Sequence, residues 1–186
     1  MCEFETRWSA DHCEKIEIGY ADDSCGLDWV FEDLRGAGCE VFSTDPVIRS
    51  AFRLHDLPHE DEAIRDYRRL MKKTMLDAYR KGDHVFFMVH GEHSCHSFRF
   101  QDSGAPRPRF SDSWICGFTV VRRKAWKEFF PNRPASRWVV RRWLDRMATY
   151  VEAQINGWIY EAVHTDKHGW CSCLTGFLSP EEALEE

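Results

Sequence analysis

The sequence predicts a single α+β domain in which a mostly antiparallel sheet is packed by two longer amphipathic helices. Helical periodicity over about residues 59–81 and 136–155 predicts the helices, and short alternating or continuous apolar runs elsewhere predict the strands. The chain has 186 residues, of which 43% are hydrophobic and 14% aromatic. It is therefore long and apolar enough to bury a core without metals or disulfides as supports.

Short strands and helices are expected in the N-terminal third, residues 1–62. Apolar side chains alternate with charged ones in residues 2–8 and 14–20, which indicates two half-buried strands. Residues 27–35 carry apolar side chains at helical spacing, which predicts a short helix. A Thr-Asp pair before Pro46 predicts the start of a second one.

The first long helix is expected over about residues 59–81. Acidic side chains stand at its start, where the helix dipole favours negative charge. Gly82 follows its end, where helices commonly terminate at a glycine in the left-handed backbone conformation. Basic side chains occupy one side. The other side carries an apolar stripe made of Ile64, Tyr67, Met71, Met75 and Ala78.

Two unbroken apolar runs, residues 84–90 and 115–121, predict central strands that are covered on both faces. The segment between these runs contains Gly104, Pro106 and Pro108. Because glycine and proline interrupt regular structure, we expect at least part of that segment to be loop.

The second long helix follows a short one expected over residues 123–130 and a break at two prolines. It runs over about residues 136–155 and is expected to end at Gly157, after which residues 158–164 and 169–177 predict a hairpin. Its apolar face is formed by Val140, Trp143 or Leu144, Met147, Val151 and Ile155.

Charge divides the chain into an acidic N-terminal third (residues 1–62), a basic middle (63–146) and an acidic C-terminal hairpin and tail (147–186). The middle carries nineteen Lys and Arg against eight Asp and Glu, although the whole chain has a formal net charge of −6. Either the acidic ends neutralise the basic middle, or faces of opposite sign meet different partners.

The N-terminal residues are charged from the third position and lack the apolar core of a signal peptide. No run approaches the roughly 18 apolar residues of a membrane span. We therefore expect a cytoplasmic protein with no membrane partner. In that compartment the eight cysteines are expected to be reduced thiols or metal ligands.

Short motifs are spread over residues 85–178, from an apolar strand to a C-terminal Gly-Phe pair. They are His93 with Ser94, Asp112 and Ser113 with Gly117 and Phe118, Tyr150 with Asn156, Gly157 and Tyr160, and Cys173 with Gly176 and Phe177. In these motifs the chain resembles a widespread family of small, largely uncharacterised proteins encoded by bacteriophages and conjugative elements. Trp114, Glu161 and Trp170 depart from the family pattern. The resemblance implies a mobile-element protein in the cytoplasm of a host cell, and such accessory proteins often bind host enzymes or defences.

Four potential metal ligands fall within seven positions, namely His90, His93, Cys95 and His96. Zinc binds neutral imidazole and thiolate, and a closed structural site needs four ligands in a tetrahedron. Because His90 continues a strand while the other three fall in a predicted loop, the four are badly placed to surround one ion. We favour a polar loop at a strand end, and zinc binding is the alternative.

Residues 122–146 carry nine Lys and Arg with tryptophans between them. Basic side chains bind phosphates and exposed aromatic rings stack on unpaired bases, so nucleic-acid binding through this segment is a second alternative. The favoured partner is a host protein or nucleoprotein complex. The expected binding residues are Arg137, Arg141, Arg142, Arg146 and Trp138, together with His93, Asp112 and Ser113.

A small hydrolase is the third alternative, with Asp112, Ser113 and a histidine as its reactive groups. However, the sequence has no nucleophile elbow, zinc-protease helix or phosphate-binding loop. The leading interpretation is a phage or mobile-element accessory protein that binds a host target stoichiometrically and without catalysis. An antagonist of bacterial defence, of the anti-CRISPR or anti-restriction type, would act in this way. Either the basic surface or the acidic N-terminal third would make the contact.

Overall fold

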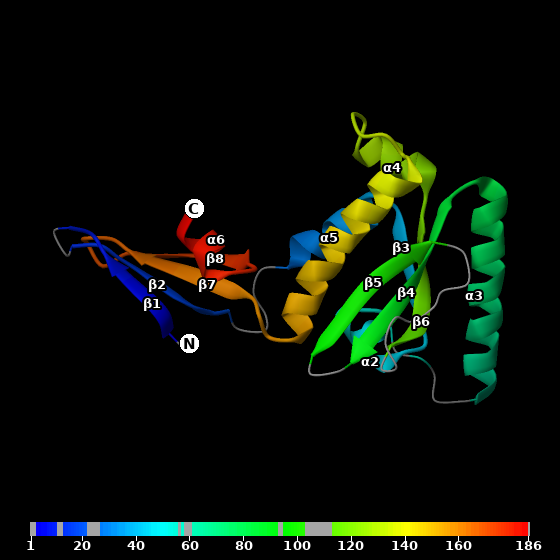
Figure 1. Cartoon of the computed structure of the whole chain (residues 1–186), viewed down its shortest axis with the longest axis horizontal. Helices are drawn as coiled ribbons and strands as arrows, with labels where there is room; N and C mark the ends of the chain where they lie inside the picture. The colour runs from blue at the N-terminus through cyan, green and yellow to red at the C-terminus, as the bar shows by residue number, and fades with distance from the viewer. Residues whose placement is uncertain are drawn as a thin grey trace. The chain divides into compact units, whose positions relative to one another are not determined.

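The computed structural model describes the chain in two compact units, each built around its own four-stranded antiparallel sheet (Figure 1). One unit comprises Met1–Trp29 and Ala153–Glu186, and the other comprises Val30–Glu152. The α+β class and the antiparallel pairing are thus confirmed, while the prediction of one domain stays a prediction. The structure describes residues 3–10, 13–21, 27–55, 57, 61–92, 95–102 and 113–185.

The sheet of the first unit has the order β1-β2-β7-β8, in which every neighbouring pair is antiparallel. Ile18, Ala162 and Phe177 form a small core on one of its faces together with Ala183 of the last helix. Both predicted N-terminal strands and the C-terminal hairpin are confirmed. The elements are β1 (Glu3–Trp8), β2 (Lys15–Tyr20), β7 (Tyr160–Thr165), β8 (Cys171–Phe177) and α6 (Pro180–Glu185).

The sheet of the second unit has the order β3-β6-β4-β5, with α3 on one face and α4 and α5 on the other (Figure 1). Among the described residues no helix is both long and apolar enough to cross a membrane. The elements are α1 (Asp28–Gly36), β3 (Cys39–Ser43), α2 (Pro46–Ala51), α3 (Asp61–Lys81), β4 (His84–Glu92), β5 (His96–Asp102), β6 (Ser113–Val121), α4 (Arg123–Phe129) and α5 (Arg137–Ile155), of which α1 begins and α5 ends in the first unit.

The two long helices place their predicted stripes against the sheet. Met71 and Met75 of α3 pack with the buried Ala78 on Val85 and Val120. The α3 prediction is confirmed from Asp61 onward, and residues 59 and 60 lie outside the described residues. On α5 the predicted positions Val140, Trp143, Leu144, Met147 and Val151 are buried, so both alternatives, Trp143 and Leu144, face the core, whereas Ile155 is half-buried.

Aromatic packing joins α5 to α4, and a glycine ends α5. Trp143 contacts Trp126 of α4, with ring centroids 5.2 Å apart, so the short helix is held against the long one. At the other end Gly157 has φ +69°, and the Trp158 N–H donates to the Ala153 carbonyl at 2.7 Å. A left-handed glycine at this position is the helix end that the sequence predicts.

Two strands, β3 and β5, were not expected. The segment after His90 was predicted to be at least partly loop, yet residues 96–102 form β5, in which Phe98 and Phe100 are buried against the sheet. His96 is therefore not a loop residue, because it lies in β5 opposite Glu92. The alternation of two phenylalanines with polar neighbours was a strand signal seven residues long that the nearby glycine and prolines obscured.

Candidate functional site

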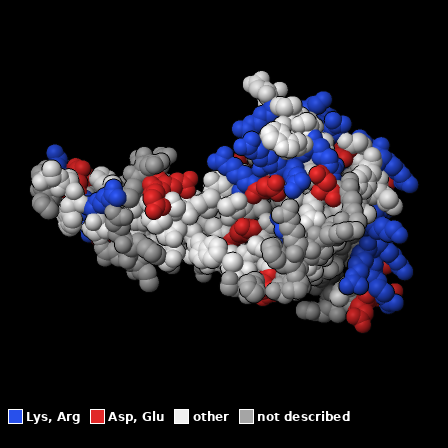
Figure 2. All heavy atoms as spheres, viewed as in Figure 1, with Lys and Arg blue, Asp and Glu red and all other residues white. Residues whose placement is uncertain are grey.

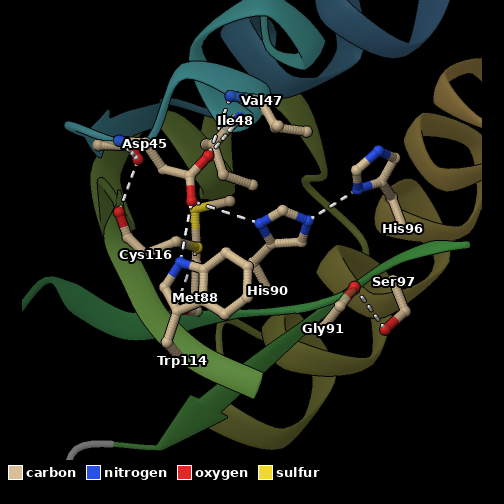
Figure 3. Close-up of polar contacts among 11 residues, drawn as sticks. Asp45, Val47, Ile48, Met88, His90, Gly91, His96, Ser97, Trp114 and Cys116 are labelled. Carbon is tan, nitrogen blue, oxygen red and sulfur yellow. Dashed lines mark hydrogen bonds and ion pairs between the residues drawn. The ribbon is translucent and has the colours of Figure 1, made fainter. Parts of the chain in front are cut away.

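The strand His84–Glu92 points His90 toward the face that carries α2, where its side chain is 0% exposed. Its Nδ1 lies 3.3 Å from Oδ2 of Asp45, and its Nε2 lies 3.0 Å from Nδ1 of His96 (Figure 3). Trp114 and Phe98 flank the imidazole, with ring centroids 4.6 and 5.1 Å away. The result is an Asp-His-His chain whose central residue, His90, is buried and packed between aromatic rings.

Asp45 connects this chain to α2. Its Oδ1 caps the helix by accepting the Val47 and Ile48 N–H groups at 2.9 and 3.2 Å, and its Oδ2 accepts the indole N–H of Trp114 at 3.0 Å. Burial alone would raise the pKa of Asp45, but the hydrogen bonds, with that from Trp114 the largest, hold this pKa below its ordinary value. Asp45 is therefore a carboxylate at neutral pH.

The charge on Asp45 sets the direction of its hydrogen bond with His90. A carboxylate only accepts hydrogen bonds, so His90 donates from Nδ1, while its Nε2 lies at hydrogen-bond distance from Nδ1 of His96. Both ring nitrogens of His90 thus have partners within the protein, and neither is left open toward a metal. His90, which the zinc alternative names as a ligand, is a buried link between β4, β5 and α2.

The remaining members of the zinc alternative are His93, Cys95 and His96. Among the described residues, no group of three His, Cys, Asp or Glu side chains is placed to hold a metal ion. Cys95 is half-buried in the turn between β4 and β5, and His93 lies outside the described residues. Zinc binding therefore stays a prediction that the geometry of His90 does not support.

The nearby thiol of Cys116 is unreactive at neutral pH. Its Sγ donates to the Met88 carbonyl at 3.3 Å, and burial, followed by the negative charge of Asp45, raises its pKa to about 12. A thiol with such a pKa stays protonated and is a poor nucleophile at neutral pH. Cys116 acts as a small buried side chain.

The hydrolase arrangement is not formed by the described residues. Ser113 pairs with Gly91 while its neighbour Trp114 pairs with His90, so Ser113 and His90 point to opposite faces of the sheet. A Cβ on Gly91 would meet the hydroxyls of both Ser113 and Ser97, which places Ser113 with Ser97 and away from the imidazoles. Asp112 lies outside the described residues.

The predicted basic face of α5 is divided into two stripes. Arg137 and Arg141 form the first, and both bind Asp102 of β5 through Nε and Nη1, at 2.7 and 3.2 Å. Arg137 also donates to the Val85 carbonyl at 2.6 Å, and Arg141 lies 3.6 Å from Asp145. These two arginines fasten α5 to the sheet, and their charges are matched by carboxylates.

The second stripe lines an open pocket of about 370 Å³. Trp138 is 67% exposed at its rim, and the guanidinium of Arg142 lies 5.5 Å from the centroid of the indole ring. Within the described part of the chain, no carboxylate lies at ion-pair distance from its arginines. We call this site the α5 pocket, and it is lined by Arg133, Trp138, Val139, Arg142, Trp143 and Arg146.

Positive charge gathers around the α5 pocket as well. Figure 2 shows Lys and Arg side chains clustered over α4 and α5. Arg123, Lys124 and Lys127 are exposed residues of α4, and Lys124 lies 3.9 Å from Glu128. Arg133 was not predicted as a binding residue, because it lies between Pro131 and Pro134, outside both helical patterns.

Comparison of the chain with protein-family models, with curated proteins and with solved structures finds no match in any of the three. The resemblance to proteins of bacteriophages and conjugative elements therefore stays a prediction. What the chain does has to be argued from its own surface.

Proposed function

We propose that the chain acts by stoichiometric binding to a host protein or nucleoprotein complex, without catalysis, and that the α5 pocket makes the contact. The resemblance over residues 85–178 supports a mobile-element origin, and a target in bacterial defence, of the anti-CRISPR or anti-restriction type, fits such an origin. The choice of this surface as the contact is based on the geometry of the α5 pocket alone.

The observation that carries the proposal is the division of the arginines of α5. Asp102 and Asp145 neutralise Arg137 and Arg141, whereas Arg142 and Arg146 face an open pocket beside Trp138. Arginine and tryptophan are the residue types that most often dominate the binding energy of protein interfaces. Exposed, uncompensated guanidinium groups also favour an anionic partner.

A pull-down from bacterial extract with a matched control tests this proposal. Arg142→Glu with Arg146→Glu should reduce capture of the partner at least roughly tenfold, because like charges across an interface are strongly unfavourable. Lys72→Glu with Lys73→Glu makes the same change of charge on exposed positions of α3 and should leave capture unchanged. Calorimetry with the captured partner should then give one site per chain. Equal capture by both double variants would exclude the α5 pocket as the contact.

A further inference from the structure

We infer that the α5 pocket binds single-stranded nucleic acid, with phosphates between the guanidinium groups of Arg133, Arg142 and Arg146 and an unpaired base stacked on Trp138. This inference rests on the proposed function, since it uses the same surface, and it names the chemistry of the ligand. Other anionic partners, above all an acidic protein, are outcomes of the test.

The phosphate part of the ligand follows from the charges. Three guanidinium groups share a pocket of about 370 Å³, a size within the range of roughly 300–1,000 Å³ that small-ligand sites occupy. Arginine presents planar donors that match phosphate oxygens in pairs. Because no described carboxylate neutralises these groups, a ligand with consecutive negative charges would relieve their mutual repulsion.

The exposed side chain of Trp138 indicates that the ligand also contains an unpaired base. The Trp138 side chain is 67% exposed in the first turn of α5, whereas Val140, two residues further on, is buried. An indole ring next to arginines is a stacking platform, and each base stacked on an aromatic side chain contributes about 1–3 kcal/mol in single-strand binding proteins. The guanidinium of Arg142 lies over one face of the Trp138 ring, 5.5 Å from its centroid, so the base stacks on the opposite face while its phosphate meets the arginines.

Unpaired bases are favoured over a duplex and over an acidic protein. In a duplex the faces of the bases are stacked on one another, so none is available to Trp138. Carboxylates of a protein would pair with the arginines but would not stack on the face of the indole that Arg142 leaves open. The basic residues of α4, which Trp126 holds against Trp143 of α5, extend the positive surface for a longer strand.

The test uses the full chain and fluorescently labelled oligothymidylate of 20 nucleotides, followed by polarisation, with a duplex of equal length as comparison. Trp138→Ala should weaken single-strand binding about 5- to 150-fold. Trp138→Phe should restore most of the affinity, because a ring remains. Trp170→Ala removes another highly exposed tryptophan, 77% exposed, from the other unit and should change nothing.

Salt dependence supplies a second readout. Each phosphate contact to a single strand contributes about 0.7 to the slope of log affinity against log salt. Arg142→Gln with Arg146→Gln should therefore reduce the slope by about 1.4. A variant that merely distorts the helix would weaken binding without this defined change in slope.

The outcomes separate the ligand from the site. Binding of the single strand with loss in Trp138→Ala but not in Trp170→Ala supports the inference. Equal affinity for duplex and single strand, or no effect of Trp138→Ala, overturns it. If no nucleic acid binds and the Arg142 and Arg146 charge reversals still abolish capture of a protein, the inference fails while the proposed function stands. If those reversals also leave capture unchanged, both fail.

Discussion

Asp45→Ala should destabilise the fold substantially, because one carboxylate serves α2, β4 and β6. The loss of a helix N-cap is worth about 1 kcal/mol. His90 is 0% exposed, so its Nδ1 donor would be left without a partner, at a cost of about 1–3 kcal/mol. The indole of Trp114 is 40% exposed and can bond to water, so it contributes little. We expect a loss of about 2–4 kcal/mol in all.

Chemical and thermal unfolding followed by circular dichroism measure this loss, which corresponds to a fall of roughly 4–16 °C in Tm for a chain of this size. Asp45→Asn should lose about half as much, because asparagine caps helices as well as aspartate and keeps an acceptor oxygen. Asp66→Ala, which removes an exposed ion pair with Arg69 on α3, serves as control and should cost less than about 1 kcal/mol. If Asp45→Ala cost no more than capping alone, about 1 kcal/mol, the bond to buried His90 would contribute nothing and the reasoning would be refuted.

Four further predictions concern other parts of the chain. Burial raises the pKa of Glu152 in the folded state above its value in the unfolded chain. The ionised Glu152 carboxylate therefore lowers the free energy of unfolding as pH rises past the unfolded pKa. Glu152→Gln should raise Tm at pH 7 but hardly at pH 4, as thermal unfolding at both pH values would show. A Cβ on Gly117 would collide with the backbone carbonyl of Phe42, so Gly117→Ala should lose about 1–3 kcal/mol in urea unfolding, and a neutral result would contradict the β3 register. Alkylation at pH 8 with mass spectrometry should leave Cys116 unmodified while the exposed cysteines of β8 react. Elemental analysis should give far less than one zinc per chain, and one tightly bound zinc that His93→Ala removes would overturn the non-metal interpretation.

The long helices could be predicted from the sequence because their patterns repeat over many turns. The predicted range 136–155 differs from the observed Arg137–Ile155 by one residue at its start. The strand β3 was missed because five residues give a pattern too little length to repeat, and because its partner β6 is distant in the chain. The strand β5 pairs with its chain neighbour β4, and it was missed because the glycine and prolines after it indicate a loop.

The candidate sites were predictable in composition but not in geometry. An aspartate before Pro46 signals a helix cap, yet nothing local indicates that Asp45 also meets His90, 45 residues away. In the same way, the arginines of α5 are evident in the sequence as a basic segment. Their division depends on where β5 places Asp102, and β5 was not predicted.

The charges of the two units bear on how the α5 pocket would meet an anionic ligand. Residues 1–29 and 153–186 carry three Lys and Arg against fourteen Asp and Glu, whereas residues 30–152 carry twenty-two against seventeen. The net charge of −6 is therefore the sum of a strongly acidic unit and a basic one. At physiological salt, charges separated by more than about 8 Å are largely screened, so the sign within a few ångströms of a surface decides contact there. The acidity of the whole chain is thus no argument against an anionic ligand, and the fine division into paired and open arginines on α5 matters more than the total.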